Sequence, residues 1–386
     1  MQKKRSLIFH DSFTNRSGTE RVNINIANIL EWDIATTIWS SNSYEAYELG
    51  YHGKVYELFH KMYGGWIGYV RMKWAFFFSR KITKNYDRVI LSNEALTAMH
   101  RVKSGAETLY YAHSLPHELF GGHAEYMKNV PFFFHEFYEF AHWLRKKLYL
   151  YEIRKVGKIM TNSRMNQEWL IRWSGRNDIK IIYPPVNMLR FHAQKVKEPF
   201  IVQEHNNVES SLEKEIQDYY VSSSRLKEKK CIDRIIHAFI HMPEKNLIIL
   251  YNPDDSEKIS SMRMASGHNN IFFHHEPSDM RIAKVIASAV ATISLAKDEN
   301  FSLVSIESMS CGIPMISVNE GVHKETILHN KTGILLRKDY TVYDIMDAIR
   351  DMTPEKSLKM KDACIERAKD FSLEKFSLEL NKFLEQ

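Results

Sequence analysis

The sequence predicts an α/β fold of two doubly wound domains. Short apolar runs alternate with amphipathic segments along the chain, a rhythm typical of parallel strands joined by crossover helices. The chain has 386 residues, which is long for one hydrophobic core and suits two domains of about 150 to 200 residues each. The rhythm breaks after Tyr183-Pro184-Pro185, where the stretch 187–218 is polar and lacks a clean period. We therefore predict domains at residues 1–186 and 187–386.

The apolar runs give the expected strands of each domain. In the first domain they lie at 6–10, 35–39, 88–92, 108–112, 158–161 and 179–183. In the second domain they lie at 219–222, 247–251, 271–273, 290–295, 315–318 and 334–336. The last segment, 372–386, has Leu373, Phe376, Leu380 and Phe383 at helical spacing, which predicts a helix with one buried face.

Composition and charge narrow the class of protein. Hydrophobic residues make up 44% and charged residues 26%, which is typical of a globular chain. The net charge of +6 suits anionic partners such as nucleotides or phospholipid headgroups but is low for a nucleic-acid binder. The three cysteines are far apart and form no C-x-x-C pair, which favours a reducing, cytoplasmic location.

The N-terminus and the apolar runs bear on membrane contact. The apolar stretch after the basic start ends at Phe9, too short for a signal peptide, and is better read as the first strand. No apolar run reaches the roughly 18 residues needed to span a bilayer, so we expect any membrane contact to be peripheral.

The most informative run joins the strand 290–295 to a helix and holds two carboxylates eight positions apart, Glu299 and Glu307. Ser302 is a candidate cap for this helix. Ligands bind at the carboxyl ends of strands in open α/β sheets, and a helix N-terminus attracts anions. We therefore predict a phosphate site here, with Glu299 facing sugar hydroxyls and Glu307 binding a ribose. Between them, Asn300, Phe301, Ser302 and Leu303 are candidates for binding the same phosphate- and sugar-containing ligand.

A second loop supplies cations after the strand 219–222. Arg225 and Lys230 flank a predicted turn, where a guanidinium and an ammonium would neutralise a diphosphate without a metal. The alternative is that both are solvated loop charges. In the first domain, Ser17-Gly18-Thr19-Glu20 has the form of a capping box, and Gly18 would let the backbone approach a ligand. The alternative there is a well-capped structural helix.

These spaced motifs resemble the donor domain of family 4 retaining glycosyltransferases of the GT-B fold. They are the pair Arg225-x4-Lys230, the pair Glu299-x7-Glu307, the run 308–314, Gly321-x3-Glu325 and the run 331–333. The first half is similar through the runs 17–22, 111–116, 161–164 and 183–186. The resemblance covers nearly the whole chain, except for about 49–84.

The resemblance implies a site and a reaction. Two Rossmann-like domains would face each other across a cleft, with the helix 372–386 crossing back to the first domain. A hexose would pass from a GDP- or UDP-linked donor to a glycan or lipid-linked acceptor, with retained configuration and without metal or cofactor. Similar enzymes are mannosyl and glucosyl transferases of surface polysaccharide or lipid-linked oligosaccharide assembly. Catalytic roles are implied for His113, Arg225, Lys230 and Glu299, and a donor-binding role for Glu307 and Gly18.

The sequence departs from the family pattern at three glycine positions. Ser17-Gly18 replaces a glycine pair, Ser302 replaces a glycine after Phe301, and Gly321-Val322 replaces a second pair, so that backbone freedom is narrower at each place. Two other functions stay open. One is a GT-B sugar-nucleotide epimerase or hydrolase, and the other is a non-catalytic nucleotide-sugar-binding protein.

Two segments, 66–81 and 131–147, combine aromatic and basic residues. They suit a membrane interface at the inner face of the membrane, or alternatively helices packed into the first domain with their cations reaching solvent. His135, Glu139 and His142 would share a helical face in the second segment, but their spacing is not that of the H-E-x-x-H zinc motif. We expect no metal there.

Overall fold

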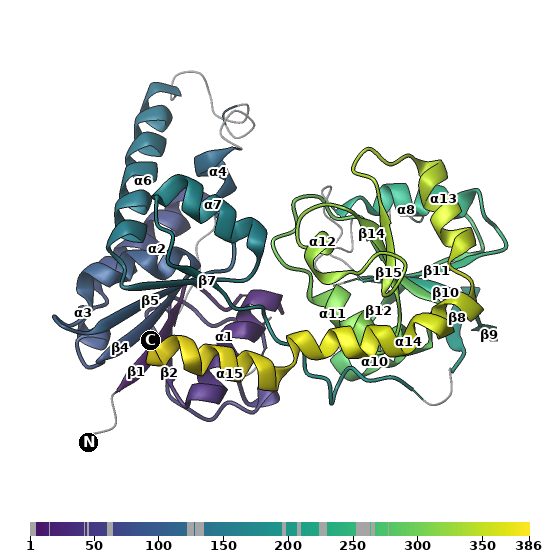
Figure 1. Ribbon diagram of the computed structural model, residues 1–386, viewed down its shortest axis with the longest axis horizontal. Helices are drawn as coiled ribbons and strands as arrows, with labels where there is room; N and C mark the ends of the chain where they lie inside the picture. Colours follow the sequence, from purple (N-terminus) through teal and green to yellow (C-terminus); the bar gives the residue numbers. More distant parts are fainter. Residues whose placement is uncertain are drawn as a thin grey trace. The chain divides into compact units, whose positions relative to one another are not determined.

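The structure is a computed structural model that forms two compact units (Figure 1). It describes residues 5–14, 16–41, 43–44, 46–59, 65–121, 127, 135–194, 198–206, 210–223, 230–251, 263, 267–276 and 278–386. The first unit comprises Met1–Tyr183 and Glu379–Gln386, and the second comprises Pro184–Leu378. The predicted boundary at Val186 falls just inside the second unit. The last helix, α15 (Leu373–Glu385), begins in the second unit and ends in the first.

The first unit is built on a seven-stranded parallel sheet with the order β3-β2-β1-β4-β5-β6-β7. Its strands are β1 (Ser6–His10), β2 (Asp33–Thr36), β3 (Val55–Glu57), β4 (Arg88–Ser92), β5 (Glu107–Ala112), β6 (Lys158–Thr161) and β7 (Ile179–Ile181). Its helices are α1 (Gly18–Leu30), η1 (Ala46–Leu49), α2 (Gly65–Phe78), α3 (Arg80–Thr83), η2 (Asn93–Arg101), α4 (His117–Phe120), α6 (His135–Lys155) and α7 (Arg164–Ser174). The central strands are buried on both faces, as expected where helices cover both sides of a parallel sheet.

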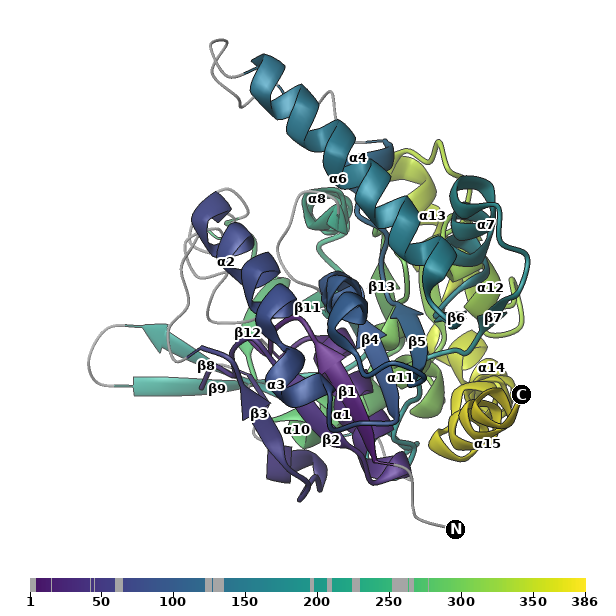
Figure 2. The ribbon, with the colours of Figure 1, turned by 90° about the vertical axis from the view of Figure 1, so that its left-hand side faces the viewer.

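The strand order fixes which helices share a face of the first sheet. The chain runs outward from β1 to β3 and then returns through β4 to β7 in the opposite direction. Because crossovers between parallel strands are right-handed, α1 lies on one face while α2, η2, α6 and α7 lie on the other. The contacts of α2 and α6 with η2, and of α6 with α7, agree with this arrangement (Figure 2).

The second unit has a six-stranded parallel sheet with the order β12-β11-β10-β13-β14-β15. Its strands are β10 (Tyr219–Ser223), β11 (Asn246–Tyr251), β12 (Ile271–His275), β13 (Ala291–Ser294), β14 (Met315–Val318) and β15 (Gly333–Leu336). Its helices are α8 (Ile232–Ile240), α10 (Asp279–Ser288), α11 (Leu303–Ser310), α12 (His323–Thr326), α13 (Val342–Asp351), α14 (Pro354–Ala368) and η6 (Lys369–Phe371). The two parallel sheets confirm the predicted pair of doubly wound α/β domains.

Two elements differ from the expectation. The polar stretch after 187 contains an antiparallel hairpin, β8 (Phe200–Asn206) and β9 (Ser210–Ile216), where we expected no regular structure. The buried side chains of Phe200 and Ile216 pair across the two strands at the open end of this hairpin and anchor that end to the unit. The edge strand β3 was also not predicted. It is only three residues long, and its pattern of exposed and half-buried side chains has no apolar run.

Candidate active site

Residues that follow three neighbouring strands of the second unit lie at one edge of its sheet. The strands β10, β13 and β14 are consecutive in the sheet and parallel, so their carboxyl ends lie together. Along the chain, Lys230 comes after β10, Glu299 after β13 and Gly321 after β14. This is the edge at which ligands bind in open α/β folds.

Lys230 and Glu299 form an ion pair in which the lysine Nζ donates to Oε2 of the carboxylate. The two side chains are 21% and 18% exposed, so the pair is partly shielded and still reachable from solvent. The residues come from loops 69 positions apart in the sequence. The structure therefore brings together one predicted cation and one predicted acid. The other cation, Arg225, lies outside the described residues.

Gly321 fits closely against the backbone of Glu299. Its φ of +55° is in the left-handed region, and a Cβ at this position would lie 2.9 Å from the Glu299 carbonyl oxygen and 3.2 Å from its nitrogen. The adjacent Val322 N–H donates to the same carbonyl at 3.2 Å. The turn after β14 thus holds the backbone of Glu299 in place, and only glycine allows this approach without strain.

The N-terminus of α11 opens onto the same loop. Ser302 is the residue before the helix, but its side chain makes no capping hydrogen bond, so the predicted capping role is wrong. Its backbone conformation is extended, while its carbonyl accepts a hydrogen bond from Ser305 N–H at 3.2 Å. Asn300 has a buried side-chain oxygen with no hydrogen-bond partner among the described residues. An unsatisfied buried acceptor is costly in a protein interior, so this amide is a candidate ligand contact.

The remaining predicted donor residues lie on or beside α11. Glu307 is buried, one turn into the helix. Phe301 is half-buried, with its ring centroid 6.3 Å from that of Phe371. Leu303 is half-buried and begins the helix. The predicted donor residues 299–303 and 307 thus form one continuous strand-to-helix segment at the edge of the sheet.

His323 is a candidate site residue that the sequence did not lead us to predict. It is completely buried at the start of α12, and its Nδ1 lies 3.3 Å from Ser305 Oγ on α11. Its Nε2 is buried without a hydrogen-bond partner in the described part of the chain. Burial lowers the pKa of His323 to about 4, while Glu299 raises the pKa and Lys230 lowers it. The signal available in the sequence was its position, two residues after Gly321 in the segment that follows the strand β14.

The lowered pKa of His323 predicts a pH-dependent stability. Between about pH 6.5 and pH 4 the unfolded chain binds a proton that the folded chain excludes, so the free energy of unfolding falls as the pH drops. We expect His323→Gln to remove about 2 kcal/mol of this loss at pH 5. Denaturant unfolding at pH 7 and pH 5 measures it, with the exposed His268→Gln as the control. Equal pH dependence in wild type and His323→Gln would contradict the assignment.

In the first unit, His113 follows β5 and lies in a buried polar network. The side chains of His10, at the end of β1, and Ser92, at the end of β4, are joined by a 3.0 Å hydrogen bond. The side-chain amide of Asn23 donates to Ser92 Oγ at 3.1 Å and lies 3.4 Å from His113 Nε2. Burial, and to a smaller extent His10, holds the pKa of His113 well below its usual range. A neutral histidine therefore sits at the carboxyl edge of this sheet, and its catalytic role stays a prediction.

Gly18 is the first residue of α1, and the predicted cap of this helix is confirmed in part. The Ser17 side chain accepts a hydrogen bond from Glu20 N–H, as in a capping box. The Glu20 carboxylate, however, accepts from Thr14 N–H at 3.0 Å and from Ser43 Oγ at 2.6 Å. Glu20 thus ties the loop after β1 to the segment after β2, close to the N-terminus of α1.

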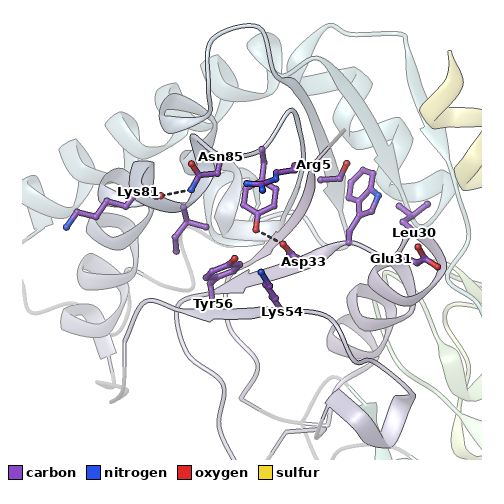
Figure 3. Close-up of a pocket in the computed structure, with 12 residues that line it drawn as sticks. Arg5, Leu30, Glu31, Asp33, Lys54, Tyr56, Lys81 and Asn85 are labelled. Carbon is purple, nitrogen blue, oxygen red and sulfur yellow. Dashed lines mark hydrogen bonds between the residues drawn. The ribbon is translucent and has the colours of Figure 1, made fainter. Parts of the chain in front are cut away.

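A separate cavity of about 440 Å³ lies at the opposite, amino-terminal edge of the first sheet (Figure 3). Its lining includes Arg5, Asp33, Lys54 and Tyr86, and the Tyr86 hydroxyl donates to Asp33 at 2.6 Å. Because parallel sheets bind ligands at the carboxyl ends of their strands, we do not assign the reaction to this cavity. No cluster of three or more potential metal ligands occurs among the residues that the structure describes, the face of His135, Glu139 and His142 included.

Comparison with solved structures identifies the class of fold. The chain is similar to sucrose-phosphate synthase from Thermosynechococcus elongatus, with a TM-score of 0.75 and 16% identity over 100% of this chain and 99% of that one. It is also similar to HepE from Anabaena, solved in complex with UDP-glucose, with a TM-score of 0.72 and 15% identity over 99% and 100% of the two chains. The fold is GT-B, as predicted.

Sequence comparison adds a family match within the second unit. Residues 203–371 match the family model described as "Glycosyl transferases group 1". The chain is 25% identical over 154 residues to D-inositol 3-phosphate glycosyltransferase of Mycobacteroides abscessus, covering 38% of this chain and 34% of the relative. It is 24% identical over 237 residues to alpha-1,3/1,6-mannosyltransferase ALG2 of Dictyostelium discoideum, covering 55% and 56%. The chain thus spans about a third and just over half of these two relatives.

Proposed function

We propose that this protein is a retaining glycosyltransferase that moves a hexose from a nucleotide diphosphate sugar to a hydroxyl of a glycan or lipid-linked acceptor. The observation that carries the proposal is the meeting of Lys230, Glu299 and the N-terminus of α11 at one sheet edge. The match of residues 203–371 to the group 1 glycosyltransferases covers all of these residues and supports it.

In the proposed mechanism the donor diphosphate becomes the partner of the Lys230 ammonium. Arg225 and the first N–H groups of α11 add further positive potential around the phosphates. Glu299, no longer paired with Lys230, accepts hydrogen bonds from hydroxyls of the transferred sugar, and Glu307 accepts them from the ribose. These preorganised groups stabilise the charge that develops on the leaving phosphate, usually the largest catalytic contribution.

In the proposed reaction one bond breaks, one bond forms and one proton is transferred, and this requires neither a separate strong base nor a metal. The bond between the sugar C1 and the phosphate oxygen breaks, and the acceptor oxygen bonds to C1 on the same face. The acceptor proton passes to the leaving phosphate oxygen. We further propose that the neutral His113 of the first unit exchanges hydrogen bonds with a hydroxyl of the reacting sugar without adding charge.

A donor screen tests the proposal. Purified protein is incubated with UDP- and GDP-linked hexoses, with and without glycan or lipid-linked acceptors, and nucleoside diphosphate release is measured. We expect acceptor-dependent release and a product whose anomeric configuration, read by NMR, matches the donor. Release of free sugar at the full rate without acceptor would indicate a hydrolase. Binding of a donor without any turnover would indicate a nucleotide-sugar-binding protein.

A further inference from the structure

The exposed aromatic side chains of the first unit are concentrated on two helices. Every phenylalanine and tryptophan that the structure describes as more than 36% exposed lies on α2 or α6. Leucine and tyrosine side chains of α6 extend this surface. The aromatic surface, as we call it, consists of Trp74, Phe77, Phe78, Phe137, Phe140, Trp143, Leu144, Leu148 and Tyr151. Exposed apolar patches of this kind mark contact sites for partners or membranes.

A half-buried carboxylate links the two helices. Glu94, on η2, accepts an ion pair from Lys73 of α2 at 2.6 Å and another from Arg145 of α6 at 3.0 Å. Lys73 and Arg145 are therefore turned inward, toward η2. Their sequence neighbours Trp74 and Leu144 are more than half exposed. Figure 2 shows α2 and α6 on the same side of the first unit.

The charged residues around the aromatic surface are mostly basic. The segment 65–84, which covers α2 and α3, contains no acidic residue, and its exposed cations are Arg80, Lys81 and Lys84. The second half of α6 adds the exposed Lys147, Arg154 and Lys155, while its one acid, Glu152, is buried. The exposed acids Glu136 and Glu139 lie in the first turns of α6, away from these cations. Lys147 also lies over the Trp143 ring, 5.9 Å from its centroid.

We propose that the aromatic surface binds an anionic phospholipid bilayer, with the rings at headgroup depth and the surrounding lysines and arginines on lipid phosphates. Aromatic side chains beside basic ones are typical of helices that lie in a membrane interface. Within the described residues no helix is both long and apolar enough to cross a bilayer, so the contact is with one face. A second copy of the chain fits less well, because a two-fold contact through this surface would bring like charges together.

The inference stands apart from the proposed glycosyl transfer, because membrane binding is measured without donor or acceptor. Full-length protein is sedimented with vesicles of phosphatidylcholine alone or mixed with phosphatidylglycerol. We expect binding to the anionic vesicles that weakens with added salt. Trp74→Ser with Phe78→Ser should lower the partition coefficient at least about tenfold, because two large apolar side chains leave the interface. Lys81→Glu with Lys147→Glu should lower the partition coefficient and remove most of its salt dependence.

A matched control separates this surface from general hydrophobicity. Tyr343 and Leu358 are 75% and 66% exposed on α13 and α14 of the second unit, and Tyr343→Ser with Leu358→Ser should bind vesicles like wild type. Circular dichroism and thermal unfolding establish that each variant is folded. The proposal is wrong if the wild type does not bind anionic vesicles or if the aromatic variants bind them as strongly as the wild type. A wild-type dimer in light scattering that only the aromatic substitutions dissociate, with vesicle binding unchanged, would assign the surface to a second copy instead.

Discussion

Lys230→Ala should lower kcat by about 10²- to 10³-fold while leaving the fold intact, because it removes a preorganised cation from the leaving phosphate. The ammonium lies beside the Glu299 carboxylate, in a partly shielded position where electrostatic interactions are stronger than in water. Glu299→Ala should also reduce turnover severely, because it removes the carboxylate that we propose accepts hydrogen bonds from hydroxyls of the transferred sugar. Initial rates at saturating donor measure both.

The control for the lysine is Lys359→Ala, which removes an exposed cation of α14 and should keep wild-type turnover. Thermal unfolding of all three variants checks that lost activity is not lost structure. Glu299 keeps some solvent contact, so removing its lysine partner should change the free energy of unfolding only slightly. Wild-type turnover in Lys230→Ala or in Glu299→Ala would contradict the proposed mechanism.

Gly321→Ala should impair turnover by at least about tenfold, because misplacing a site group by an ångström can cost about a hundredfold. The new Cβ would lie 2.9 Å from the Glu299 carbonyl oxygen, a backbone atom that can only move away by shifting the loop. The left-handed conformation adds a strain of roughly 1–2 kcal/mol. We expect lower kcat and a lower melting temperature together.

Gly267 separates the effect of backbone strain from the effect of displacing Glu299. Its φ of +54° is nearly the same as that of Gly321, but a Cβ there would meet no atom of the described residues within 4 Å. Gly267→Ala should therefore lose the same roughly 1–2 kcal/mol of stability without loss of turnover. If Gly321→Ala and Gly267→Ala had equal activity, the contact between Gly321 and Glu299 would have no role in the site.

The sequence predicted the parallel sheets because buried strands leave a strong local signal. Each apolar run that we predicted as a strand overlaps a strand of the structure, and runs such as 88–92 and 315–318 coincide with one. The hairpin of β8 and β9 gave no such signal, since it has only two strands and is not part of the parallel sheet. Its pairing depends on contacts that the linear pattern does not contain.

Site residues could be predicted where a charged side chain follows a predicted strand of the parallel sheet. Lys230 and Glu299 were identified because each follows a strand, and parallel strands bring their carboxyl ends to one edge. The capping prediction for Ser302 failed because residue type alone does not fix side-chain direction. His323 was missed because it is notable for its burial and for an Nε2 without a partner among the described residues, and both depend on packing between α11 and α12.

The most direct test of the account is calorimetric titration of nucleoside diphosphates, UDP and GDP first, into wild type, Lys230→Ala and Lys359→Ala. We predict that one nucleotide binds to wild type and to Lys359→Ala, and that Lys230→Ala weakens its binding at least about tenfold, the loss of one charged hydrogen-bonding partner. Binding that is unchanged in a folded Lys230→Ala variant, or no binding of any nucleoside diphosphate to wild type, would contradict the claim that this sheet edge holds a diphosphate.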